Sequence, residues 1–232
     1  MAIPLVIAHR GASAEKPENT LAAFRRALAL KADGIELDVH VTCDGVPVVF
    51  HDSTLLRLTG TRGRIASQTW PQLEKLRVRG TEPIPSLADA LGLVRGRMLV
   101  QIELKAGVPV APVVSAIAAA RAAVWVVLGS FDLELVREAR RLAPAVPRML
   151  ISEGRTTPAT LVRQLAALGA RGLSVNHHAV RSPAWLGYFR SRDYTVWCWT
   201  VNEEKRMREL AGWGADAILS DDPGLLARTL SS

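Results

Sequence analysis

The stretch GIELDVHVTCDGVPVVFHD, residues 34–52, combines an alternating strand pattern, a tight turn and a histidine. Residues i and i+2 of a strand point to the same face, so Glu36 and Asp38 share one face while apolar residues occupy the other. Asp-Gly between two apolar runs predicts a hairpin. With a two-residue loop, Asp38 lies opposite His51 across the hairpin. The stretch therefore predicts two acids and a histidine on one patch of sheet.

On both sides of this hairpin, apolar strands alternate with segments of helical spacing. Strands are predicted at 3–8, 34–41, 98–104, 124–130, 148–152, 172–176, 194–201 and 216–220. Helices are predicted from about 21 to 28, after Ser86, and at 110–122, 132–142, 158–168, 183–191, 203–212 and 223–230. Eight strand–helix units predict an α/β chain folded as one (β/α)8 TIM barrel over residues 1–232. An open doubly wound sheet is the alternative, which the lack of a Gly-rich dinucleotide motif after the first strand weakens.

Residues 53–85 interrupt the alternation. Glycines and prolines recur there, and only a short helical piece near 71–76 is predicted. We interpret this segment as a small inserted loop after the hairpin.

The composition limits the classes of partner. The formal charge is +7, and arginines dominate it, with 24 Arg against 5 Lys. Because these arginines are scattered, they do not predict a nucleic-acid partner, but a basic field suits an anionic small-molecule substrate. Two cysteines predict neither a disulfide framework nor a cysteine metal site.

No apolar run is long enough to span a bilayer. The N-terminal run MAIPLVIA lacks a basic flank and a small-residue cleavage site, so it is interpreted as a strand and not as a signal peptide. The sequence predicts a soluble, cytoplasmic protein and leaves a homodimer open.

Barrel active sites lie at the carboxyl ends of the strands. Polar and aromatic side chains collect at these predicted ends: His9, Arg10, Glu36, Asp38, His51, Glu103, Lys105 and Trp199. Three carboxylates without cysteine suit a hard cation, Mg²⁺ or Ca²⁺. Histidines supply an acid and a base, and Arg10 and Lys105 supply positive charge for a phosphoryl group. The set predicts metal-dependent cleavage of a phosphoester.

Short motifs in this order resemble those of the glycerophosphodiester phosphodiesterases, a family of barrel enzymes. They are HRG at 9–11, PENT at 17–20, ELDV at 36–39, DG at 44–45, HD at 51–52, IPSLADAL at 84–91, IELK at 102–105, SF at 130–131, WTVN at 199–202 and SDDP at 220–223. The short insertion and the lack of a signal peptide are similar to the cytosolic bacterial members.

The resemblance implies hydrolysis of glycerophosphodiesters to sn-glycerol 3-phosphate and an alcohol. His9 and His51 match the family's acid/base pair, and Trp199 matches an aromatic residue near the substrate. The metal ligands would be Glu36, Asp38 and Glu103, and the phosphate contacts Arg10 and Lys105. Attack by the substrate's own 2-hydroxyl and attack by water both fit these residues.

Two other functions stay open. A lysophospholipase D would need an apolar entrance, which the polar segment 53–85 argues against, and a non-catalytic barrel would bind phosphorylated ligands without turnover. Asp221 stands before the last predicted helix, and we interpret it as the cap of that helix.

Overall fold

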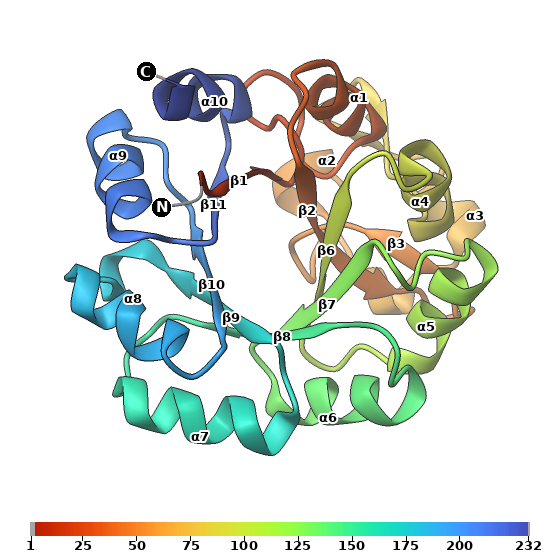
Figure 1. Cartoon of the computed structure of the whole chain (residues 1–232). Coiled ribbons are helices and arrows are strands. Elements are labelled where there is room, and N and C mark those ends of the chain that lie inside the picture. The colour runs from red at the N-terminus through yellow and green to blue at the C-terminus, as the bar shows by residue number, and fades with distance from the viewer. Residues whose placement is uncertain (1–2, 232) are drawn as a thin grey trace.

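Eight parallel strands close into a ring in the computed structural model, which describes residues 3–231 (Figure 1). In order around the ring they are β1 (Leu5–His9), β2 (Gly34–Val41), β6 (Leu99–Leu104), β7 (Val126–Ser130), β8 (Arg148–Ser152), β9 (Gly172–Asn176), β10 (Thr195–Trp199) and β11 (Ala217–Ser220). Because β1 pairs with both β2 and β11, the sheet has no free edge at the join. The predicted TIM barrel is confirmed and the open sheet is excluded.

Helices surround the ring and cover its outer face (Figure 1). They are α1 (Leu21–Ala29), α4 (Leu87–Val94), α5 (Val110–Ala119), α6 (Leu133–Leu142), α7 (Pro158–Leu168), α8 (Pro183–Arg190), α9 (Glu204–Trp213) and α10 (Pro223–Ser231). Each turns an apolar stripe to the strands, as α7 does with Leu161, Leu165 and Leu168. Within residues 3–231, none of the helices combines the length and the apolar character needed to cross a bilayer.

Apolar side chains fill the interior of the ring. Ile7, Met149, Trp197 and Leu219 are buried together there, apart from the cluster between strands and helices. As in other TIM barrels, this layer makes the centre a packed core, so polar side chains gather above it.

The hairpin after β2 differs from the predicted one. The return strand β3 (Pro47–Val49) pairs with β2 in a register one residue away, and a three-residue turn, 43–45, joins them. The backbone N–H of Phe50 donates to the carbonyl of Asp38 at 2.9 Å, so the prediction that His51 lies opposite Asp38 is wrong. Because His51 follows the end of β3, ladder alternation does not set its direction, and its side chain still faces the barrel mouth.

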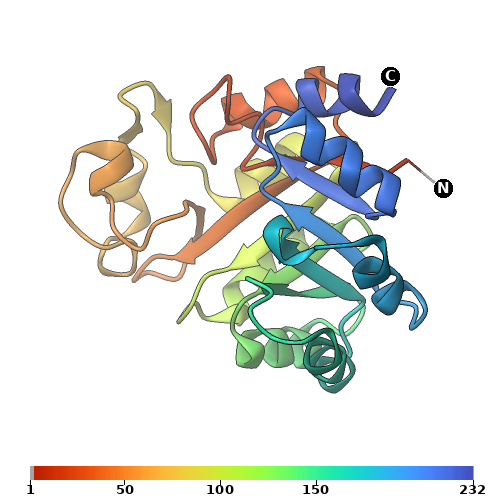
Figure 2. The ribbon, with the colours of Figure 1, turned by 90° about the vertical axis from the view of Figure 1, so that its left-hand side faces the viewer.

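The segment 53–85 was predicted to be mainly loop, but it contains several regular elements. It contains α2 (Leu56–Thr59), a 3₁₀ turn η1 (Ile65–Ser67), α3 (Trp70–Leu73) and the paired strands β4 (Arg77–Val78) and β5 (Glu82–Pro83). Buried apolar residues give it a small core: Val48, Phe50, Leu55, Leu58, Ile65, Leu73, Val78 and Ile84. This unit stands out beyond one end of the barrel (Figure 2) and holds the arm that carries His51.

Candidate active site

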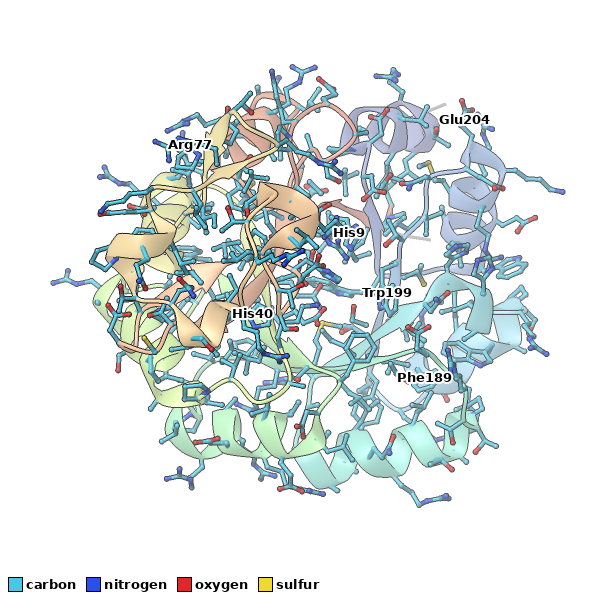
Figure 3. All side chains as sticks on the ribbon, turned by 180° about the vertical axis from the view of Figure 1, so that it is seen from behind. His9, His40, Arg77, Phe189, Trp199 and Glu204 are labelled. Carbon is cyan, nitrogen blue, oxygen red and sulfur yellow. The ribbon has the colours of Figure 1, made fainter. Side chains whose placement is uncertain are left out.

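A pocket of about 270 Å³ opens at the carboxyl ends of the barrel strands. Figure 3 looks into this mouth, with His9 and Trp199 near its centre and Arg77 and Glu204 at the periphery. The predicted site residues that line the pocket are His9, Arg10, Glu36, His51, Glu103, Lys105 and Trp199. The remaining one, Asp38, is 1% exposed and contacts Arg10 and Lys105 of the pocket wall. The fold thus brings all the predicted site residues to one place.

Glu36, Asp38 and Glu103 form a carboxylate triad. One oxygen from each lies within 4.8 Å of the others. Parallel pairing of β2 with β6 sets this geometry, because it places Asp38 beside Glu103 in register. Three oxygen donors without sulfur or nitrogen fit a hard cation such as Mg²⁺ or Ca²⁺.

Two cations neutralise part of the triad. Lys105 Nζ lies 2.7 Å from Asp38 and 2.5 Å from Glu103, and Arg10 Nε lies 3.3 Å from Asp38. Burial alone would raise the pKa of Asp38, but Lys105 and Arg10 outweigh it and lower that pKa. Burial, reinforced by the negative charge of Asp38, raises the pKa values of Glu36 and Glu103, for Glu36 well above its usual range. The raised pKa values indicate that three ionised carboxylates are unfavourable together at this buried place, and a divalent cation would relieve this.

His9 is held by a carboxylate from the last strand–helix junction. Its Nδ1 lies 2.7 Å from Asp221 Oδ1, and its Nε2 lies 4.0 Å from Glu36. Burial alone would raise the pKa of Asp221, but hydrogen bonds from His9, Asn202 and Ser13 lower it to about 2. Asp221 is therefore ionised and only accepts, so His9 Nδ1 carries the hydrogen and Nε2 faces the pocket.

The helix cap lies one residue further along. Asp222 Oδ1 accepts from the backbone N–H of Leu225 at 2.8 Å at the start of α10. The prediction that Asp221 is this cap is wrong, because its carboxylate instead contacts His9 across the junction.

His51 has a similar arrangement. Its Nδ1 lies 2.7 Å from Asp52 Oδ1, and the other oxygen of Asp52 accepts from Arg57 at 2.6 Å. Hydrogen bonds from Arg57 and His51 outweigh burial and lower the pKa of Asp52 to about 2. Burial lowers the pKa of His51, so this imidazole is neutral at pH 7 with Nε2 free to accept a proton. The two histidines thus present equivalent nitrogens to the pocket.

Asn19 supports the triad from the first loop. Its Nδ2 donates to Asp38 Oδ2 at 2.7 Å, and its Oδ1 accepts from the Asp38 backbone N–H at 3.2 Å. Asn19 and Thr20 both precede α1, and both are residue types that can cap a helix. Thr20 is the cap, since its Oγ1 accepts from the backbone of Ala23. Asn19 is therefore free to hold the carboxylate.

Several pocket residues were not predicted. Phe131 packs edge-on against Trp199, with ring centroids 5.8 Å apart. Gln101, Ser174 and Glu153 also line the pocket. Two of them carried a usable signal: Phe131 belongs to the SF motif at 130–131, and Gln101 lies two residues before Glu103 and so shares its face of β6.

Known proteins share this combination of fold and motifs. The model of the glycerophosphoryl diester phosphodiesterase family matches residues 9–225. The chain belongs to this family. Membership confirms the resemblance and makes the protein a phosphoric diester hydrolase.

Individual members of the family are similar over nearly the whole chain. The glycerophosphodiester phosphodiesterase of Caldanaerobacter subterraneus subsp. tengcongensis is 33% identical over 236 residues, which cover 96% of each chain. A solved phosphodiesterase of Oleispira antarctica, in complex with the product sn-glycerol-3-phosphate, superposes with a TM-score of 0.89 at 28% identity and covers 99% of this chain and 98% of its own. A glycerophosphodiester phosphodiesterase of Agrobacterium tumefaciens has a TM-score of 0.86 at 28% identity, covering 97% of this chain and 100% of its own.

Proposed function

We propose that the protein hydrolyses glycerophosphodiesters to sn-glycerol 3-phosphate and an alcohol, with Mg²⁺ or Ca²⁺ bound by Glu36, Asp38 and Glu103. The observation that carries this proposal is one pocket in which two carboxylate-bound histidines stand beside the triad. The product bound in the Oleispira antarctica phosphodiesterase supports the substrate class.

A bound divalent cation would polarise the phosphoryl group and offset its negative charge. Arg10 and Lys105 would orient the same group from the pocket wall, where their hydrogen-bond donors lie against Asp38. Trp199, backed by Phe131, would close one side of the pocket around the substrate. Together these residues would hold the phosphorus between the two histidines.

His51 would act as the base and His9 as the acid. Neutral His51 accepts the proton of the attacking hydroxyl at Nε2, as its lowered pKa allows. The bond from phosphorus to the leaving alcohol breaks, and protonated His9 supplies a proton to that oxygen. Attack by the substrate's 2-hydroxyl would form a cyclic phosphate that water then opens, whereas attack by water would reach the product directly.

Removal of metal tests the proposal. After chelation, hydrolysis of glycerophosphocholine is expected to fall at least about a hundredfold, because the triad's cation supplies several kcal/mol of charge stabilisation. Adding back Mg²⁺ or Ca²⁺ restores it. Coupled detection of sn-glycerol 3-phosphate measures the rate, and Glu36→Gln serves as the matched variant, which needs more metal for the same rate. Full activity after chelation would contradict metal dependence.

Metal affinity is expected to depend on pH. The raised pKa of Glu36 means that this carboxyl holds a proton at pH values where an ordinary glutamate is ionised. Protons therefore compete with the cation, and affinity falls by up to about tenfold per pH unit as the pH falls through that pKa. Calorimetric titration with Mg²⁺ at several pH values measures the slope. A Glu36→Gln protein should show a shallower slope, and equal slopes would refute the assignment.

The alternative, lysophospholipase D activity, is tested with lysophosphatidylcholine as substrate by measuring the choline released, because the other product is lysophosphatidic acid and not sn-glycerol 3-phosphate. Phe131 is an exposed apolar side chain at the pocket and is the feature that would contact an acyl chain. We favour glycerophosphodiesters as the substrate class, because most of the side chains that line the pocket are polar. The cytoplasmic location and the homodimer stay predictions.

A further inference from the structure

The pocket floor contains buried polar side chains without a hydrogen-bond partner in residues 3–231. Gln101 of β6 is 1% exposed and Ser174 of β9 is 0% exposed. Neither the amide atoms of Gln101 nor Oγ of Ser174 has a partner among these residues, and the same holds for Nε1 of Trp199. Because buried polar groups are nearly always bonded, such groups in a pocket wall indicate a ligand or water that completes them.

These groups come from three strands of the barrel and line the same pocket as Glu36 and Glu103. Gln101 is in register with Glu36 and lies two residues before Glu103, so it sits beside Glu36 and one layer below Glu103. Ser174 is in register with Trp197, a residue of the apolar layer. Gly129 leaves space beside the amide, since a Cβ there would lie 3.5 Å from Gln101 Nε2. The floor is thus a polar layer of the same pocket, and it adjoins the apolar cluster that contains Ile7, Met149, Trp197 and Leu219.

We propose that Gln101, Ser174 and the indole N–H of Trp199 bind the hydroxyl groups of the substrate's glycerol moiety. The inference rests on the proposed function, in which the triad and its cation bind the adjoining phosphoryl group. An amide and a hydroxyl both donate and accept, and a vicinal diol does the same within a short length. A quaternary ammonium head group would leave the floor unsatisfied, because it donates no hydrogen bond.

A ligand series on the Mg²⁺-loaded protein tests this. sn-Glycerol 3-phosphate, propyl phosphate and inorganic phosphate share the phosphoryl group, but only the first has the two hydroxyls. Calorimetry should show that the wild type prefers sn-glycerol 3-phosphate to propyl phosphate by roughly tenfold, the size expected for one or two neutral hydrogen bonds. Gln101→Leu and Ser174→Ala should each reduce this preference severalfold and leave affinity for inorganic phosphate unchanged.

Thermal unfolding of the variants without ligand separates a role in binding glycerol from a role in the stability of the fold. Removing an unsatisfied buried group removes its cost to folding, so Gln101→Leu is expected to match or exceed the wild-type Tm while it binds sn-glycerol 3-phosphate less tightly. Ser130→Ala is the matched control. Ser130 is also buried, but its Oγ donates to the carbonyl of Leu104 at 2.7 Å, so its loss should lower Tm and keep the ligand preference.

The possible failures are distinguishable. If both floor variants keep the wild-type preference, the floor holds only water and the inference is wrong, although the proposed function stands. The same conclusion follows if Gln101→Leu lowers Tm without changing the preference. If the wild type neither hydrolyses glycerophosphocholine nor binds sn-glycerol 3-phosphate, the proposed function fails, and this inference fails with it.

Discussion

Replacing His51 by asparagine is expected to lower kcat for glycerophosphocholine by roughly 10²–10⁴-fold, the usual contribution of a general acid or base. The asparagine side chain can still occupy the space beside Asp52, but it cannot accept a proton near neutral pH. Because His51 is anchored through Nδ1 to Asp52, its Nε2 is the atom that the variant loses. Steady-state rates of sn-glycerol 3-phosphate release measure the effect.

His178→Asn is the matched control, since His178 is exposed and lies outside the pocket. It should keep the wild-type rate. Thermal unfolding of both variants checks that each remains folded. Wild-type kcat in a folded His51→Asn protein would remove His51 from the mechanism.

Asp221→Asn is expected to cause a loss of similar size, roughly 10²–10⁴-fold in kcat, because it removes the carboxylate that orients His9 and stabilises its protonated form. The ionised Asp221 carboxylate requires a hydrogen on His9 Nδ1. A carboxamide carries no negative charge to pair with the protonated imidazole, and it can offer its own N–H to Nδ1 instead, so it no longer supports the form of His9 that donates a proton from Nε2. Measured kcat, KM and the pH profile of kcat test this, since a purely structural role would leave the profile unmoved.

The neighbouring acid provides the control. Asp222→Asn keeps a good helix cap, because asparagine caps about as well as aspartate, so both activity and stability should stay close to wild type. If Asp222→Asn lost as much activity as Asp221→Asn, the contact between Asp221 and His9 would not explain the effect.

The barrel and its triad were predictable because both follow local periodicities. Strand and helix spacing repeats along the chain, and the i, i+2 relation places Glu36 and Asp38 on one face before any tertiary contact is known. The convergence with Glu103 then follows from the rule that the carboxyl ends of parallel strands meet.

The predictions that were wrong concern contacts that no local sequence pattern encodes. The hairpin register depends on Thr42, whose Oγ1 bonds Asp44 at 2.5 Å and accepts from the Val46 backbone at 2.9 Å, which makes the turn three residues long. The choice between Asp221 and Asp222 as the cap depends on a loop from the other end of the chain. The apolar residues of segment 53–85 follow neither period, so their common core was not visible in the sequence.

The pairing of β1 with β11 has a consequence for biosynthesis. His9 and its partner Asp221 are 212 positions apart, so His9 is synthesised well before Asp221. A nascent chain that has released only its first strands already carries the triad and both histidines, yet His9 still lacks the carboxylate that fixes its tautomer. Full turnover is therefore expected only after β11 has paired with β1, so enzymatic activity would report closure of the barrel.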